Sequence, residues 1–182
     1  MTEPAAEGRA AWAVRSATAV DRDSILRLVE AAFTGPDHDA ADEVAIVAET
    51  WSLGKAIEDL ELVAEGNGSI VGHVLGARGD VGGDAVLAIA PLAVAPAHQH
   101  QGVGSALMTE LLSRADRQGW PAAVLLGSPA YYRRFGFEPA GPLGLVYEPV
   151  GPDSPYFQVR RLSSFPHAPR GVVRYCWETA EG

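Results

Sequence analysis

The sequence predicts an α/β fold in one globular domain, because helical and strand-like periodicities alternate along the chain. Residues 21–33 and 40–52 carry apolar side chains at the spacing of an amphipathic helix. From residue 58 the apolar period changes to two, which is typical of strands with one buried face. A nearly continuous apolar run over residues 85–94 then leads through a polar turn into a further helix and a short apolar strand.

Composition agrees with a folded domain. The chain has 182 residues, of which 47% are hydrophobic and 20% are charged, and this is enough for a substantial core. Residues 1–10 are rich in Ala, Glu and Gly and are predicted to be disordered, so the predicted domain covers residues 11–182. The net charge of −9 argues against broad nucleic-acid binding.

The sequence also argues against a membrane protein and against a metal-binding protein. No apolar run reaches the roughly 18 residues of a membrane helix, and the first residues lack the basic start of a signal peptide. We therefore predict no membrane association and a cytoplasmic location, which agrees with the single cysteine, Cys176. His98 and His100 stand in a loop without Cys or carboxylate neighbours, so we expect solvated side chains and no metal.

In the first half of the chain, Asp21 is expected to be the N-cap of the first helix. Gly66-Asn67-Gly68 separates two alternating runs and predicts a tight β-hairpin. The predicted elements in this half are strand, helix, helix, strand and strand at residues 12–15, 21–33, 40–52, 58–65 and 70–78.

In the second half, Gly119 is suited to follow the C-terminus of a helix, and Gly136 ends a short helical segment. A strand is expected to begin at Phe137. The other predicted elements are strand, helix, strand, short helix, strand and strand at residues 85–94, 102–118, 122–126, 130–135, 156–162 and 171–178.

The turn between the apolar strand and the third helix has the features of an anion site. Gly102 and Gly104 have no Cβ, so a ligand can approach the backbone. The first N–H groups of the helix have no intrahelical partner, and the helix dipole adds about half a positive charge there. The turn lacks the lysine of a nucleotide P-loop and the third glycine of a dinucleotide fingerprint. Two interpretations remain, namely a phosphate-binding turn and a purely structural one.

Two motifs together suggest a family. The pattern Q-x-x-G-x-G at Gln99, Gly102 and Gly104 resembles the acetyl-CoA pyrophosphate loop of the GCN5-related N-acetyltransferases (GNAT). About thirty residues later, Tyr131-Tyr132-Arg133-Arg134-Phe135-Gly136-Phe137 resembles a second block of that family. The segments PLAV at 91–94, LGSPAYYRRFGF at 126–137 and FQVRRL at 157–162 resemble its YhbS-like branch.

The resemblance implies a GNAT fold, a central mixed sheet flanked by helices, in which strands 85–94 and 122–126 are parallel neighbours that splay apart. The exposed backbone of Leu92, Ala93 and Val94 would pair with the pantetheine amides of acetyl-CoA. Pro91 and Pro96 suit such an interruption of the sheet, although they also fit simple strand ends. The pyrophosphate would lie on the N–H groups of residues 101–105. The resemblance thus implies a set of cofactor-binding residues, Leu92, Ala93, Val94, Gln99, His100, Gln101, Gly102, Val103, Gly104 and Ser105.

Acetyl transfer to an amine requires a proton donor for the leaving thiolate. Tyr132 matches the family's motif, and a tyrosine stays protonated at neutral pH, so Tyr132 is the candidate general acid. The alternative is that Tyr132 only packs in the core, which is the role expected of Tyr131. For the general base the sequence leaves several candidates open, namely Asp84, Glu65, Glu43, His73 and a water relay.

The resemblance favours an N-acetyltransferase that uses acetyl-CoA as co-substrate and a primary amine of a small molecule or a protein as acceptor. A homodimer is compatible with such a fold. A domain that binds acyl-CoA as a sensor or interaction module is the alternative, because strand 85–94 carries no carboxylate to act as a base. A nucleotide-binding α/β domain is disfavoured by the missing Lys and Gly.

Overall fold

The computed structural model describes residues 12–180, so the predicted disorder of residues 1–10 lies outside the described part. The helices are α1 (Arg22–Phe33), α2 (Ala41–Ser52), α3 (Val103–Arg117) and the single turn α4 (Pro129–Tyr132). The strands are β1 (Ala13–Ser16), β2 (Ala56–Gly66), β3 (Ser69–Val81), β4 (Asp84–Val94), β5 (Ala122–Leu126), β6 (Glu138–Pro139), β7 (Leu145–Val146), β8 (Phe157–Arg161) and β9 (Gly171–Val172).

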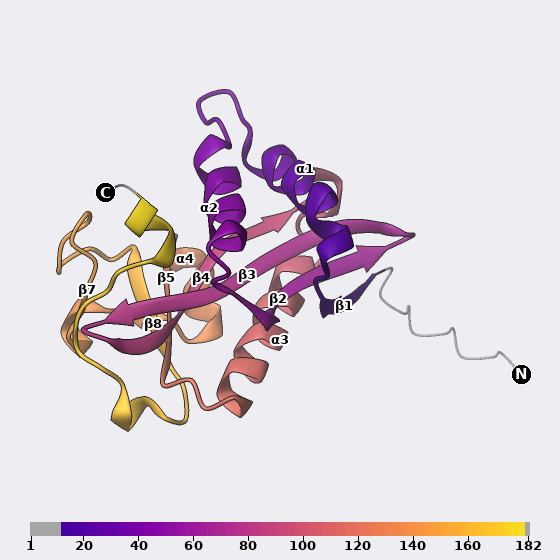
Figure 1. Cartoon of the computed structure of the whole chain (residues 1–182). Coiled ribbons are helices and arrows are strands. Elements are labelled where there is room, and N and C mark those ends of the chain that lie inside the picture. Colours follow the sequence, from indigo (N-terminus) through magenta and orange to yellow (C-terminus); the bar gives the residue numbers. More distant parts are fainter. Residues whose placement is uncertain (1–11, 181–182) are drawn as a thin grey trace, which may run out of the picture.

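A seven-stranded sheet forms the centre of the fold, with strand order β1-β2-β3-β4-β5-β8-β6. The pair β4–β5 is parallel and the other neighbours are antiparallel, so the predicted mixed sheet is confirmed. Helices α1 and α2 cover one face, and α3 covers the other (Figure 1). Each helix buries its apolar face against the sheet, as the helical spacing of its residues predicts.

The hairpin and the helix ends follow the predicted turn chemistry. Asn67 and Gly68 have φ values of 51° and 74° between β2 and β3, and two positive φ angles are what a tight hairpin turn requires. Gly136 has a φ of 79° and ends the short helical segment that follows α4. The predicted helices and the strands up to residue 126 are confirmed, with bounds that differ by up to three residues.

The parallel pair β4–β5 is unusually short. Its register comprises only Leu87 with Ala123 and Ala88 with Val124. Beyond Ala88, β4 continues to Val94 while pairing with β3 alone among the described strands. The two central strands therefore diverge from residue 89 onward, and the backbone of the last part of β4 is open on the side of β5.

The C-terminal segment departs from expectation. Residues 171–178 were predicted as one strand, but only Gly171–Val172 is a strand, which pairs with β7, and Cys176–Ala180 is a 3₁₀ helix. The rings of Tyr175 and Trp177 stack at 4.7 Å between centroids. Because i and i+2 side chains of an extended strand stand about 6.6 Å apart, this stacking requires a turn. The predicted strand at 156–162 is confirmed as β8.

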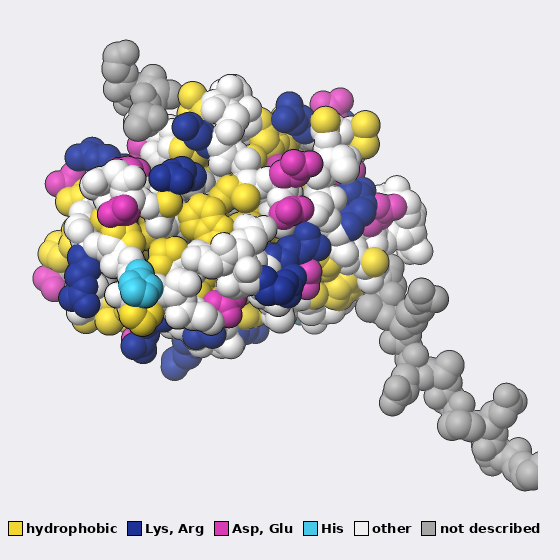
Figure 2. Space-filling model, turned by 60° about the horizontal axis from the view of Figure 1, so that its bottom comes forward, with side chains coloured by type: hydrophobic (Ala, Val, Ile, Leu, Met, Phe, Trp, Pro, Cys, Tyr) yellow, Lys and Arg dark blue, Asp and Glu magenta, His cyan; other side chains and the backbone are white. Residues whose placement is uncertain are grey.

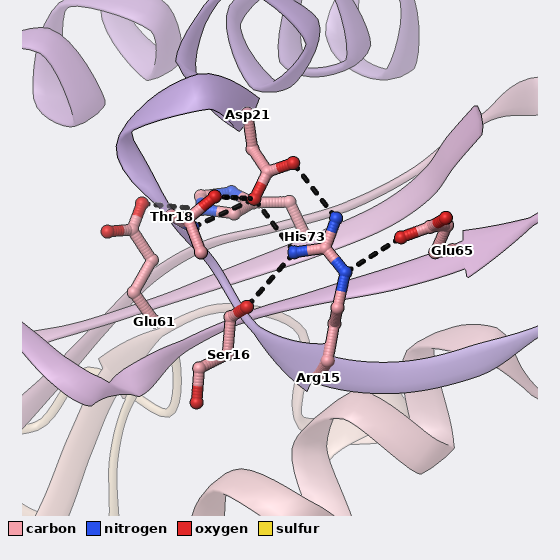
Figure 3. Close-up of polar contacts among 7 residues, drawn as sticks. All are labelled: Arg15, Ser16, Thr18, Asp21, Glu61, Glu65 and His73. Carbon is pink, nitrogen blue, oxygen red and sulfur yellow. Dashed lines mark hydrogen bonds and ion pairs between the residues drawn. The ribbon is translucent and has the colours of Figure 1, made fainter. Parts of the chain in front are cut away.

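A charged cluster ties the N-terminal strand to α1 (Figure 3). Asp21 occupies the N-cap position of α1, as predicted, but its carboxylate makes no capping bond to that helix. It accepts two hydrogen bonds from the Arg15 guanidinium, at 2.8 and 2.9 Å, and two from the backbone and hydroxyl of Thr18. Arg15 also contacts the half-exposed Glu65 at 2.7 Å. The bond from Arg15 holds the pKa of Asp21 well below its usual range.

We expect Asp21→Asn to lower the free energy of unfolding at pH 7 by about 2 kcal/mol, because buried charge-assisted hydrogen bonds are lost. The folded-state pKa of Asp21 is lowered, so its contribution is present above the unfolded pKa near 4 and disappears as the pH falls below it. Urea unfolding of the variant and the wild type at pH 7 and at about pH 3 checks both statements. The matched change Glu65→Gln should cost less than about 1 kcal/mol, since that carboxylate is exposed. If Asp21→Asn lowered the free energy of unfolding equally at both pH values, the stabilising role assigned to the ionised Asp21 carboxylate would be wrong.

Candidate active site

A groove of about 690 Å³ lies where the ends of α1 and β4 meet the start of α3 and the turn α4. It begins beside the open edge of β4 and runs to the N-terminus of α3. Its lining consists of Ala32, Phe33, Leu92, Val94, His98, Gln99, His100, Gly102, Val103, Gly104, Ser105, Ser128, Tyr131, Tyr132 and Arg134.

The N-terminus of α3 offers unpaired backbone donors to this groove. Gly102 has a φ of 85° and caps the helix, and the first N–H to bond back is that of Ala106, at 3.0 Å from the Gly102 carbonyl. The N–H groups of residues 103–105 precede it and have no intrahelical acceptor. Donors with this arrangement, together with the helix dipole, suit a phosphate group.

The absence of a side chain at Gly104 shapes the groove wall. A Cβ at this position would lie 2.8 Å from the Tyr131 hydroxyl oxygen, closer than real contacts allow. His98 also lines the groove, but its Nδ1 is buried without a hydrogen-bond partner among the described residues. Gly104 therefore leaves space at the groove wall for a ligand that accepts from the backbone of α3.

Most residues expected at a cofactor site line the groove, and two do not. Ala93 is 1% exposed and is the register partner of His73 in β3, so its side chain does not reach the groove. The Gln101 side chain turns back and donates to the Ala97 carbonyl at 2.9 Å. Gln99 lines the groove, but its amide donates to the Val94 carbonyl at 3.2 Å and so closes the turn.

The two tyrosines of α4 occupy different environments. The Tyr132 ring lies against Gly127, where a Cβ would be 2.3 Å from the ring, and it packs edge-on against Phe137 at 5.9 Å between centroids. The Tyr131 ring stacks under Arg134 at 4.6 Å, and its hydroxyl reaches Gly104. Tyr131 was expected only to pack, whereas the structure places its hydroxyl at the helix N-terminus.

Burial keeps both tyrosines protonated. Desolvation raises the pKa of Tyr132 to about 12, with a smaller contribution from Tyr131. Desolvation also raises the pKa of Tyr131, although the charge of Arg134 and a hydrogen bond with Ser105 oppose the shift. At neutral pH each hydroxyl is therefore a hydrogen-bond donor.

None of the four side chains considered as a general base lines the groove. Asp84 begins β4 at its opposite end, Glu65 is ion-paired with Arg15, and Glu43 contacts a histidine of the α1–α2 loop. His73 is fully buried and contacts Glu61 at 3.0 Å (Figure 3).

Sequence reasoning missed part of the lining. Ala32 and Phe33 carry no motif signal, and they line the groove because the apolar face of α1 reaches it at the last turn of the helix. His98 and Ser128 carry no motif signal. Arg134 belongs to the second motif without an assigned role, and the structure places it at the groove.

A known protein family matches most of the chain. Residues 13–140 match the family described as the acetyltransferase (GNAT) domain. The chain belongs to the GNAT family. Among curated GNAT relatives, the uncharacterized N-acetyltransferase YhbS of Escherichia coli K12 is 39% identical over 107 residues, which cover 57% of this chain. That alignment spans 64% of the length of YhbS, slightly less than two thirds. The resemblance to the YhbS-like branch is thereby confirmed.

Solved GNAT structures share the fold over nearly the whole chain. Escherichia coli YhbS in complex with CoA superimposes with a TM-score of 0.81 and 30% identity, covering 94% of this chain and 93% of that one. A GNAT acetyltransferase from Brucella melitensis in complex with acetyl-CoA gives a TM-score of 0.74 and 30% identity, covering 90% of this chain and 95% of that one. The predicted GNAT fold is confirmed.

The described residues include neither a candidate metal site nor a membrane-spanning helix. Within residues 12–180, His, Cys, Asp and Glu form no group of three or more that could hold a metal ion. In the same part of the chain, every helix is too short or too polar to cross a bilayer.

Proposed function

We propose that this protein transfers acetyl from acetyl-CoA to a primary amine of a small molecule or a protein by direct attack. The single observation that carries the proposal is the groove that joins the open edge of β4 to the unpaired N–H groups of α3. A ligand with an extended amide chain and a pyrophosphate matches these two features. That YhbS and the Brucella melitensis protein are seen with CoA and acetyl-CoA supports the same ligand.

Different residues of the groove would bind different parts of acetyl-CoA. The N–H groups of residues 103–105 would hold the pyrophosphate, and the open backbone of Leu92 and Val94 would pair with the pantetheine amides. The neutral Gln99 contributes no charge, so Arg134, the one Arg or Lys side chain that lines the groove, would supply the positive charge for the phosphates. Bound acetyl-CoA would supply an acetyl group activated as a thioester.

Tyr132 is the proposed general acid. Its hydroxyl is protonated at neutral pH, and burial raises its pKa further, to about 12. It can therefore donate a hydrogen bond to the sulfur as negative charge develops there. Since the four candidate bases lie away from the groove, a water relay is the proposed route by which the amine loses its proton.

Calorimetric titration with acetyl-CoA at fixed salt tests the ligand. We expect binding in the micromolar range, followed by amine-dependent release of CoA when acceptors are screened. No binding at millimolar acetyl-CoA would mean that the turn at residues 99–104 is only structural. Binding without turnover on any amine would favour the sensor interpretation.

A further inference from the structure

A second hollow, of about 720 Å³, adjoins the groove along α3. Arg134 lines both, and Thr109 of the hollow lies one helical turn, about 6 Å, after Ser105 of the groove. The hollow lies between α3, the segment after α4 and the end of β8. Its polar lining includes Thr109, Asp116, Arg134, Arg160, Arg161 and Ser163.

Three arginines face this hollow, and they differ in their partners. Arg161 is ion-paired with Glu138 at 2.8 Å. Arg134 uses Nε to bond the Tyr131 carbonyl at 2.9 Å, which leaves its terminal nitrogens for other acceptors. Arg160 lies against Gly136, where a Cβ would be only 2.7 Å from Nη1, and no carboxylate of the described residues is within ion-pair distance of it.

The pKa of Asp116, the one acidic side chain in the lining, is lowered mainly by hydrogen bonds from Ser163 and also by the nearby charge of Arg160, but Asp116 makes no ion pair with an arginine of the described residues. Asp116 accepts hydrogen bonds from the Ser163 backbone at 2.7 Å and from the Ser163 hydroxyl at 2.9 Å. Elsewhere on the α3 side of the molecule, basic and acidic side chains are interspersed (Figure 2). The three arginines of the hollow outnumber its acidic neighbours, which are Asp116 and the Glu138 paired with Arg161, so the hollow has a local excess of positive charge in a chain of net charge −9.

We propose that this hollow binds the 3′-phosphate of CoA through Arg160 and Arg134. The assignment rests on the proposed function, which places the pyrophosphate at residues 103–105, one turn of α3 away. A phosphate monoester carries about −1.5 to −2 charges at pH 7 and offers three acceptor oxygens. The planar fork of a guanidinium matches two of them. The hollow would thus distinguish CoA from its 3′-dephospho analogue, and Arg160 is the residue that makes the distinction.

Titration of wild type and Arg160→Gln with CoA and with 3′-dephospho-CoA, at one ionic strength, tests this. For the wild type we expect about tenfold tighter binding of CoA, equivalent to about 1.4 kcal/mol. Arg160→Gln should lose that preference by weakening CoA alone. Arg117→Gln removes the same charge from α3 outside the hollow and should leave both affinities unchanged.

The outcomes separate the two proposals. Equal affinity of the wild type for both ligands, or an Arg160→Gln loss that is the same for both, would overturn the 3′-phosphate site alone. If the hollow instead holds free inorganic phosphate, phosphate would stabilise the wild type and not Arg160→Gln, while the two CoA ligands bind alike, and this also overturns the assignment. Failure to bind either CoA ligand would overturn the proposed function together with this site.

Discussion

Gly102→Trp is expected to abolish binding of acetyl-CoA, with a loss of affinity of at least about 100-fold. Nothing lies within 4 Å of a Cβ at Gly102, so the indole would project into open space at the N-terminus of α3. There it would cover the N–H groups of residues 103–105 that are proposed to hold the pyrophosphate. Direct titration measures the effect, since 100-fold corresponds to about 2.7 kcal/mol.

The chain provides a matched control for this substitution at the other end of α3. Gly119 also has a positive φ, 80°, and open space around its Cβ position. Because a side chain at positive φ is strained, Gly119→Trp and Gly102→Trp should each lower the free energy of unfolding by about 1–2 kcal/mol. Gly119→Trp should bind acetyl-CoA like the wild type. If Gly102→Trp keeps its affinity, the pyrophosphate does not bind at this turn.

Tyr132→Phe is expected to lower kcat by about 100-fold while leaving the affinity for acetyl-CoA unchanged, because general acid catalysis contributes at least this much. Phenylalanine keeps the ring that packs against Gly127 and Phe137. The substitution thus removes the hydroxyl without opening a cavity, so it separates the two roles considered for Tyr132. Steady-state rates with a saturating acceptor, alongside acetyl-CoA titration, give both quantities.

Tyr131→Phe is the control, since it removes a hydroxyl one residue earlier and should change kcat by less than about threefold. The pH dependence adds a second criterion. Because the pKa of Tyr132 is raised to about 12, its acid form persists, and kcat should not fall on its account up to about pH 10. An unchanged kcat in Tyr132→Phe would leave Tyr132 a packing residue only.

Periodicity and turn chemistry were sufficient for most of the fold. The long amphipathic helices and the Asn67-Gly68 hairpin depend on local spacing, and the structure has them where the sequence predicts them. The failure at residues 171–178 has a physical cause. The alternating apolar residues there include Tyr175 and Trp177, whose rings stack on each other in a turn. A period-two pattern does not distinguish such a turn from a strand.

The site was only partly accessible from the sequence. The glycines of the turn could be found because a helix N-terminus near a ligand constrains residue type locally. Ala32 and Phe33 could not, since their part in the groove depends on where α1 ends against β4. Arg160 was equally hidden, because β8 brings it beside Gly136 from a distant position in the chain.

The short β4–β5 register divides the central sheet into two mechanical units. One consists of β1 to β4 and the other of β5, β8 and β6, and two residue pairs join them directly. Cooperative unfolding requires contacts that cross such a seam, and here α3 on one face of the sheet and the apolar cluster that joins Val86 and Ala88 to Val124 and Phe157 on the other supply them. A ligand that bonds to the open edge of β4 and contacts Ser128 and Tyr131 after β5 would bridge the seam. Binding of the ligand would then couple the unfolding of the two units and raise the stability of the sheet.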